Sequence, residues 1–190
     1  LTITSYTPTT VAPTGTVTIT GTNFSTTLSD NVVKFGGVDA VETAATATSI
    51  TVTVPAGISS GSLTVTSGGV TVTAPVAYTA VATPSITSIS SSTVVVGGSV
   101  TITGSGFSST GAQNVVKFNG TTATVTAATS TQLTVTVPAG VTAGNITVTY
   151  AGVTLTSASA YAVAATPTLT SVSSLVVAEG GLVTLTGTNF

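Results

Sequence analysis

One ten-residue stretch recurs at a fixed spacing and constrains the chain more than any other feature. Residues 15–24 read GTVTITGTNF, residues 98–107 read GSVTITGSGF and residues 181–190 read GLVTLTGTNF. Successive copies are 83 residues apart, since 107 − 24 = 83 and 190 − 107 = 83. A fixed period of this kind is the signature of a tandem array. The sequence therefore predicts two full units, 1–83 and 84–166, and a truncated third unit, 167–190, that holds only the first two strands.

Within each unit, apolar and polar residues alternate with the period of a β-strand. From Thr16 to Thr20, for example, Val17 and Ile19 fall on one face and the threonines on the other. Glycine or proline marks nearly every boundary, and no helical periodicity is present. The expected strands of the first unit are 1–6, 16–20, 31–37, 38–42, 49–54, 61–66 and 70–74, with a turn at 21–23 and a break between Pro8 and Pro13. This pattern predicts an all-β chain of antiparallel β-sandwiches with about seven strands each.

Four motifs follow one another in the same order in both full units. After the GTVTITGTNF stretch come VKFGG at 33–37, TVPAG at 53–57 and GSLTVT at 61–66, and their counterparts stand at 116–120, 136–140 and 144–149. This order resembles that of IPT/TIG domains. The resemblance implies tandem immunoglobulin-like sandwiches of the kind found in bacterial multi-repeat cell-surface proteins. Such domains serve as spacers and binding modules, and the family has no catalytic residues to carry over.

Charged side chains are too few for most catalytic chemistry. The chain has 2 Lys+Arg, 4 Asp+Glu, no His and no Cys. Residues 84–166 contain no Asp or Glu at all, so neither a carboxylate pair nor a Ser-His-Asp arrangement can form there. We therefore expect no catalytic residue, no cofactor and no enzyme activity.

Most of the charged side chains could have either a specific role or an ordinary surface role. Asp30, Asp39 and Glu42 could together offer oxygen ligands to calcium, or they are isolated surface charges, which we favour because the second unit lacks them. Lys34 and Lys117 could form an isopeptide crosslink to asparagine, or they face solvent from a strand, which we also favour.

Three partner classes are disfavoured or left as minor alternatives. Nucleic acid is disfavoured because Lys+Arg number 2 and cannot neutralise a phosphate backbone. Membrane insertion is disfavoured because no apolar run approaches the roughly 18 residues of a spanning helix. The threonine rows could present hydroxyl groups to ice or sugar, but β-branched threonine is also the ordinary choice for an outward strand position.

Some residues suggest modification or contacts between units. Asn23, Asn119 and Asn145 each begin an acceptor triplet for N-glycosylation, although such triplets arise by chance in a Thr-rich chain. Tyr78 and Tyr161 are expected to pack at the joint between units. The linkers 79–84 and 162–167 are short and end in proline, so we expect successive units to hold a fixed relation.

The truncated third unit is the candidate assembly segment. Two strands without a covering sheet are marginally stable in water. Three explanations remain open: the segment continues in a longer chain, it is disordered, or another copy of the chain completes it by strand addition. The residues that would be covered in an assembly are Pro167, Leu169, Val172, Val183, Leu185 and Phe190.

These observations favour a non-catalytic structural repeat protein. It would form or extend an extracellular filament, sheath or surface stalk, with other copies of itself as partners. The alternative is an adhesin stalk or a carbohydrate-binding accessory module, with surface glycans as partners. Both readings place the chain outside the cell or on its surface.

Overall fold

The computed structural model describes residues 1–174 and 176–190, and its first repeat is a β-sandwich. One sheet has the strand order β1-β3-β7-β6 and the facing sheet has the order β5-β4-β8-β9, with all pairs in both sheets antiparallel. The strands are β1 (Thr2–Thr7), β2 (Thr10–Val11), β3 (Thr16–Thr22), β4 (Asn31–Phe35), β5 (Val38–Asp39), β6 (Val41–Ala45), β7 (Ser49–Thr53), β8 (Leu63–Ser67), β9 (Val70–Thr73) and β10 (Thr79–Ala80). A single 3-10 turn, η1 (Leu28–Asp30), precedes β4.

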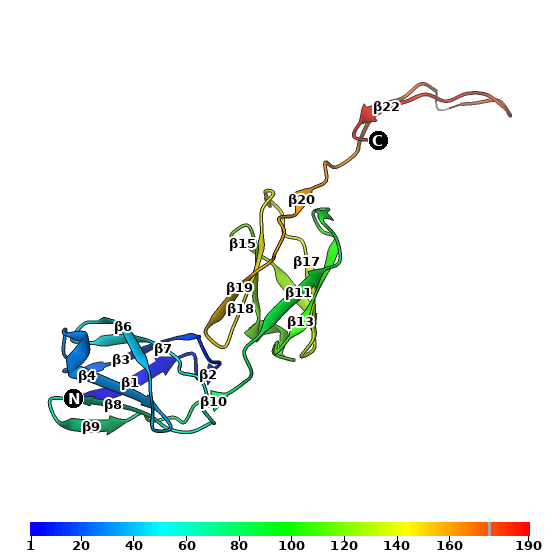
Figure 1. Ribbon diagram of the computed structural model, residues 1–190. Coiled ribbons are helices and arrows are strands. Elements are labelled where there is room, and N and C mark those ends of the chain that lie inside the picture. The colour runs from blue at the N-terminus through cyan, green and yellow to red at the C-terminus, as the bar shows by residue number, and fades with distance from the viewer. Residues whose placement is uncertain (175) are drawn as a thin grey trace.

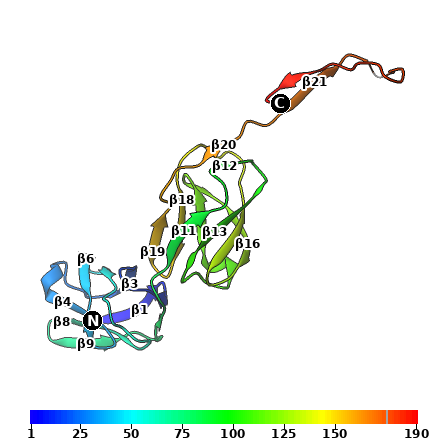
Figure 2. The same ribbon diagram turned by 45° about the vertical axis from the view of Figure 1, so that its right-hand side comes forward.

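The second repeat has the same architecture and follows the first in space, with a hairpin projecting beyond it (Figures 1 and 2). Its sheets have the orders β11-β13-β17-β16 and β15-β14-β18-β19. Its strands are β11 (Ser85–Ile89), β12 (Thr93–Val94), β13 (Ser99–Ser105), β14 (Val115–Phe118), β15 (Thr121–Thr122), β16 (Thr124–Ala128), β17 (Gln132–Thr136), β18 (Ile146–Tyr150), β19 (Val153–Thr156) and β20 (Ala162–Val163), with η2 at Gly111–Gln113. The terminal hairpin pairs β21 (Thr168–Val172) with β22 (Leu185–Thr188). The expected sandwich class is thereby confirmed.

The alternation in the sequence places the core as expected. Along β3, Val17 and Ile19 are fully buried, whereas Thr16 and Thr20 are exposed. Each repeat has its own apolar cluster between its two sheets. Burying a Val, Ile, Leu or Phe side chain stabilises a fold by about 1.5–3 kcal/mol, so these clusters are the main stabilising feature of each unit.

Within the recurring stretch, the ring of the final phenylalanine packs against the glycine three residues before it. An added Cβ on Gly21 would lie 2.6 Å from Cζ of Phe24 and would also collide with the carbonyl oxygen of Thr2 on the neighbouring strand. The same contact recurs between Gly104 and Phe107, also at 2.6 Å. Phe24 and Phe107 are each only 4% exposed, so this contact closes one end of the core in both repeats.

Three details of the first repeat differ from the sequence prediction. The predicted strand 38–42 is two strands, because β5 pairs with β4 in one sheet and β6 pairs with β7 in the other. The stretch between Pro8 and Pro13 contains β2, which pairs in parallel with β10, and β12 pairs with β20 in the same way. A two-residue strand between two prolines carries no periodic signal. The predicted turn at 21–23 is also wrong for its first two residues, because β3 continues to Thr22 and the chain turns at Asn23, where φ is +60°.

Tyr78 and Tyr161 lie in the cores of their own repeats, and the expectation that they pack at the joint is wrong. Tyr78 meets Phe35 edge to face with ring centroids 5.1 Å apart, and Tyr161 meets Phe118 at 5.2 Å. Their hydroxyl groups differ. Tyr161 donates to the carbonyl oxygen of Thr142 at 2.7 Å, whereas Tyr78 Oη has no hydrogen-bond partner among the described residues.

This difference predicts opposite effects of removing the two hydroxyl groups. Tyr161→Phe should lower the free energy of unfolding by about 0.5–1.5 kcal/mol, because it deletes a buried hydrogen bond. Tyr78→Phe should leave the stability unchanged or raise it, because no bond is lost. Urea unfolding of both variants measures the difference, and equal losses would contradict the assignment.

Alkaline pH should destabilise the fold through three tyrosines. Burial raises the pKa of Tyr6, Tyr78 and Tyr161 above the usual 10.0, and for Tyr6 the neighbouring Tyr78 adds to the effect. Below pH 10 the phenols are neutral in both states, so their contribution is fully present. As the pH rises above 10, the unfolded chain loses these protons first and stability falls. Urea midpoints at pH 8 and pH 11 test this, and an unchanged midpoint would contradict it.

Candidate functional site

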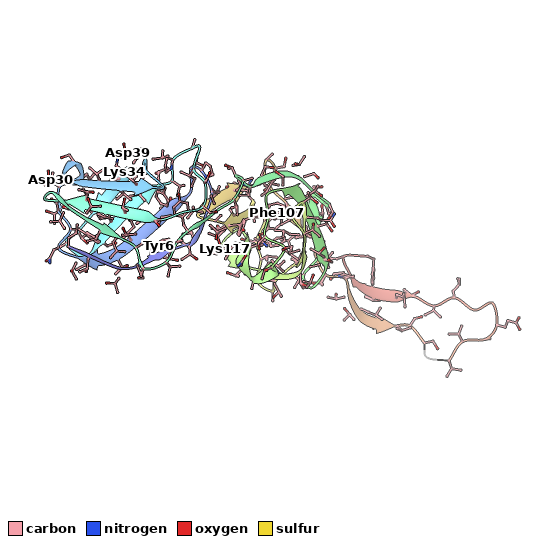
Figure 3. The ribbon with its side chains drawn as sticks, turned by 90° about the horizontal axis from the view of Figure 1, so that it is seen from below. Tyr6, Asp30, Lys34, Asp39, Phe107 and Lys117 are labelled. Carbon is pink, nitrogen blue, oxygen red and sulfur yellow. The ribbon has the colours of Figure 1, made fainter. Side chains whose placement is uncertain are left out.

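The charged side chains are dispersed, with one ion pair in the first repeat. Lys34 Nζ lies 3.0 Å from Asp39 Oδ1, and the two side chains are 41% and 68% exposed. Figure 3 shows Asp30, Lys34 and Asp39 on the first repeat and Lys117 on the second. An exposed pair of this kind contributes about 0–1 kcal/mol. The preferred reading of Lys34 as a solvent-facing strand residue is confirmed, and Lys117 is exposed as well.

Glu42 has a structural role that the sequence did not reveal. Its Oε1 accepts a hydrogen bond of 2.8 Å from the backbone N–H of Val33, so it ties β6 to β4. It is therefore not an isolated surface charge, in contrast to our expectation. Asp30 accepts a bond from Ser25 Oγ at 3.0 Å. In residues 1–174 and 176–190, no three His, Cys, Asp or Glu side chains gather closely enough to hold a metal ion.

The three candidate glycosylation sites differ in how accessible their amide groups are. Asn23 is exposed at a turn. Asn119 is exposed, but its amide donates to Thr142 Oγ1 at 2.9 Å and to the carbonyl oxygen of Ala143 at 3.0 Å. Asn145 is half-buried and donates to the carbonyl oxygen of Ser157 at 2.7 Å. Glycosylation stays a prediction, and Asn23 is the site with the fewest competing contacts in this set.

The terminal hairpin exposes residues whose counterparts form cores in the full repeats. Leu185 is 57% exposed and Phe190 is 78% exposed, whereas Ile19 and Ile102 are fully buried. Val183 is 42% exposed, against 0% for its counterpart Val17. Of the other predicted assembly residues, Pro167 and Leu169 are exposed and Val172 is half-buried. These side chains occupy one hairpin, but no second sheet covers them in the described chain.

The two repeats are joined by backbone hydrogen bonds. The N–H of Ala12 donates to the carbonyl oxygen of Ala151 at 3.1 Å, and the N–H of Thr16 donates to the carbonyl oxygen of Gly152 at 2.9 Å. Ala12 lies in the loop between β2 and β3 and Thr16 is the first residue of β3, whereas Ala151 and Gly152 form the turn between β18 and β19. We call this contact the joint.

The joint also contains a small apolar cluster. Ala12, Ala151 and Val153 are buried together, and Val81 of the linker packs against them with Tyr150 and Leu155. Ala12 is fully buried and Val153 is 9% exposed. The linker is thus part of the joint, because the N–H of Val81 also donates to the carbonyl oxygen of Val11 at 2.9 Å.

Two glycines allow the backbones to approach at the joint. A Cβ on Gly15 would lie 2.7 Å from the carbonyl oxygen of Ala151, and a Cβ on Gly152 would lie 2.6 Å from the carbonyl oxygen of Thr16. Real Cβ atoms do not come so close, so each position requires glycine. Sequence reasoning did not identify the joint, because Gly15 belongs to the recurring stretch and Gly152 reads as an ordinary hairpin glycine. The residues that precede them differ from those that precede their counterparts Gly98 and Gly69, but this difference does not indicate a contact with another repeat.

No helix in the described part of the chain is long and apolar enough to span a membrane.

Comparison with solved structures finds similar folds in larger proteins. The extracellular region of plexin A4 matches with a TM-score of 0.50 and 20% identity, over 90% of this chain and 16% of that one. SGBP-B from a complex xyloglucan utilization locus in Bacteroides uniformis matches with a TM-score of 0.38 and 24% identity, over 85% of this chain and 49% of that one. A putative phosphatase from Bacteroides thetaiotaomicron matches with a TM-score of 0.40 and 31% identity, over 44% of this chain and 18% of that one. The chain spans less than half the length of each.

A search of curated proteins finds no match. The sequence profile of the IPT/TIG domain, in contrast, matches twice in tandem, at residues 1–80 and 84–164. These two matches cover most of the chain and coincide with the two sandwiches described above. The chain therefore belongs to the IPT/TIG domain family.

Proposed function

We propose that this chain is a non-catalytic structural segment of an extracellular or cell-surface stalk or filament, in which IPT/TIG units are stacked in a fixed relation. The observation that carries the proposal is the joint, where two backbone hydrogen bonds and a buried cluster connect consecutive units. A flexible string of domains would need no such contact. In this proposal the first unit ends at residue 83 and the second at residue 166.

The contacts at the joint favour one arrangement over many. A hydrogen bond within a protein contributes about 0.5–1.5 kcal/mol net, so the two bonds together favour the docked arrangement by about 1–3 kcal/mol. The alanine and valine contacts add to this. Because the linker residue Val81 takes part in the cluster, docking leaves little free chain between the sandwiches.

Each repeat also carries the counterpart of the surface that the other repeat contributes to the joint, and this counterpart is uncovered. In the second repeat, Val95 stands where the first has Ala12 and is 50% exposed rather than 0%. In the first repeat, Val70 stands where the second has Val153 and is 54% exposed rather than 9%. An interface of this head-to-tail type can continue from unit to unit without closing. It is therefore suited to an extended array.

The terminal hairpin supplies the proposed point of growth. It carries the first two strands of a unit and exposes the side chains that a unit buries. We propose that Leu169, Val172, Val183, Leu185 and Phe190 become covered when the third unit is completed, either by further sequence or by strand addition from another copy. Pro167 sets the start of this segment.

The alternative function, as an adhesin stalk or a carbohydrate-binding accessory module, has weaker support from the geometry. Sugar sites commonly present a flat exposed aromatic ring. Tyr6, Tyr78 and Tyr161 are at least 94% buried and Tyr150 is half-buried, while Phe190 is the exposed aromatic residue within the described ranges. Titration with xyloglucan oligosaccharides distinguishes the functions, since the structural proposal expects no saturable binding.

Substitution at the joint tests whether the units are held in place. Gly152→Ala should weaken docking by about 1–3 kcal/mol, because the added Cβ would displace Thr16 and break the two hydrogen bonds. The matched control is Gly69→Ala, whose glycine has nearly the same φ of +77° against +81° but has nothing within 4 Å of the added Cβ. The control therefore carries the same backbone strain without the collision.

Distances between spin labels provide the readout. The chain has no cysteine, so cysteines introduced at the exposed, equivalent positions Thr43 and Thr126 give one label in each repeat. We expect a narrow distance distribution in the parent and in Gly69→Ala, and a broad one in Gly152→Ala. Equally broad distributions in all three proteins would overturn the proposal of stacked units.

A further inference from the structure

The second repeat contains a hollow that the joint and the assembly segment do not use. It is a cavity of about 270 Å³ between β11 and the segment 157–161. Ile86, Ile89 and Tyr161 supply apolar walls, and hydroxyl groups surround them, notably those of Ser88 and Ser159. None of the residues that line this cavity in the described structure is charged. A lining of this kind suits a neutral, partly apolar group.

The first repeat shows what fits at this place. The counterpart of Ile89 is Tyr6, since 89 − 6 = 83. Tyr6 is 6% exposed, and its hydroxyl donates to the carbonyl oxygen of Val76 at 2.9 Å. Its phenol thus bridges β1 and the segment that corresponds to residues 157–161. The first repeat fills with its own side chain a position that the second repeat leaves open.

The groups that hold the phenol in the first repeat are present in the second. The counterpart of Val76 is Ser159, whose carbonyl oxygen accepts one bond from Ser157 Oγ at 2.8 Å. A carbonyl oxygen has two lone pairs and can accept a second bond. The counterpart of Tyr78 is Tyr161, which is held by its contact with Phe118 at 5.2 Å and by its bond to Thr142. An aromatic wall and an acceptor therefore remain in place.

We propose that the hollow between β11 and residues 157–161 is a binding site for one phenolic ring, which occupies the place that Tyr6 fills in the first repeat. The hydroxyl group donates to the carbonyl oxygen of Ser159, and the ring packs against Ile86, Ile89 and Tyr161. The cavity is smaller than the roughly 300–1,000 Å³ of sites for drug-sized ligands, so a single ring fits better than an oligosaccharide. The ring can come from a tyrosine side chain of another polypeptide or from a small free phenol.

The test uses the full 190-residue chain labelled with ¹⁵N and titrated with p-cresol. We expect saturable shifts of the amide signals of Ile89, Ser159 and Tyr161, with a dissociation constant on the order of 1 mM for so small a ligand. Toluene lacks the hydroxyl group and should bind about ten-fold more weakly. Equal binding of toluene, or no saturable shift with p-cresol, would overturn the proposal.

Two variants exchange the occupants of the two repeats. Ile89→Tyr should fill the hollow and abolish the p-cresol shifts. Tyr6→Ile should open the same place in the first repeat, which would then gain p-cresol-dependent shifts at Ser5 and Ala77. If Ile89→Tyr does not fold, Tyr6→Ile still decides the matter. Unchanged p-cresol binding in a folded Ile89→Tyr, or no new site in a folded Tyr6→Ile, would contradict the assignment.

A third arm distinguishes the source of the ring. The acetylated and amidated peptide Gly-Tyr-Gly presents a tyrosine side chain on a polypeptide. Binding of both the peptide and p-cresol supports the site and identifies a polypeptide partner. Binding of p-cresol alone supports the site and identifies a free phenol. Binding of neither overturns the site.

Discussion

Close approach of backbone segments, at positions where only glycine fits, determines both the unit and the connection between units. Within a unit, Gly21 lies beneath the ring of Phe24 and beside the neighbouring strand, so the ring can close the end of the core. Between units, Gly152 lies against Thr16 and allows two backbone hydrogen bonds to form. A methyl group at either position would meet atoms at 2.6 Å. Close approach at a glycine thus occurs both inside a repeat and between repeats.

The joint makes the linker a part of the fold. Val81 belongs to the cluster of Ala12, Ala151 and Val153, and β10, which forms the start of the linker, is paired with β2. The chain consequently leaves the first sandwich already bound to it and enters the second after few residues. With few charges to repel neighbouring copies and a neutral threonine-rich surface, such a chain is suited to lateral contacts. These features are consistent with a structural role.

Much of the fold could be predicted from the sequence, because repetition and alternation are local signals. The strand from Thr16, the buried Val17 and Ile19, and the closing Phe24 follow from period two and from the recurring stretch. The joint could not be predicted, since Gly152 and Gly69 both follow the pattern of a hairpin glycine and only the structure shows that Gly152 contacts the other repeat. The role of Glu42 was missed for a similar reason: its backbone partner, Val33, lies on another strand. The position of Tyr78 was mistaken because proximity to the linker in sequence does not place a ring at the joint.

The hollow in the second repeat could not be predicted for the same reason: it depends on a contact between residues that are distant in sequence. Aligning the repeats pairs Tyr6 with Ile89, but the alignment does not show that the Tyr6 ring reaches Val76 across the edge of the sheet. Repeats of one fold thus serve as references for one another. The hydrogen bond that Tyr6 makes in the first repeat indicates which group would fit beside Ile89 in the second.

The central claim is that consecutive units are held as one body by the joint. Residual dipolar couplings, measured on the backbone amides of both sandwiches in one aligned sample, test this most directly. If the account is right, one alignment tensor fits the couplings of residues 1–80 and 84–164 together, in the orientation shown in Figure 1. Two tensors of different magnitude would show that the units move independently, and would contradict it.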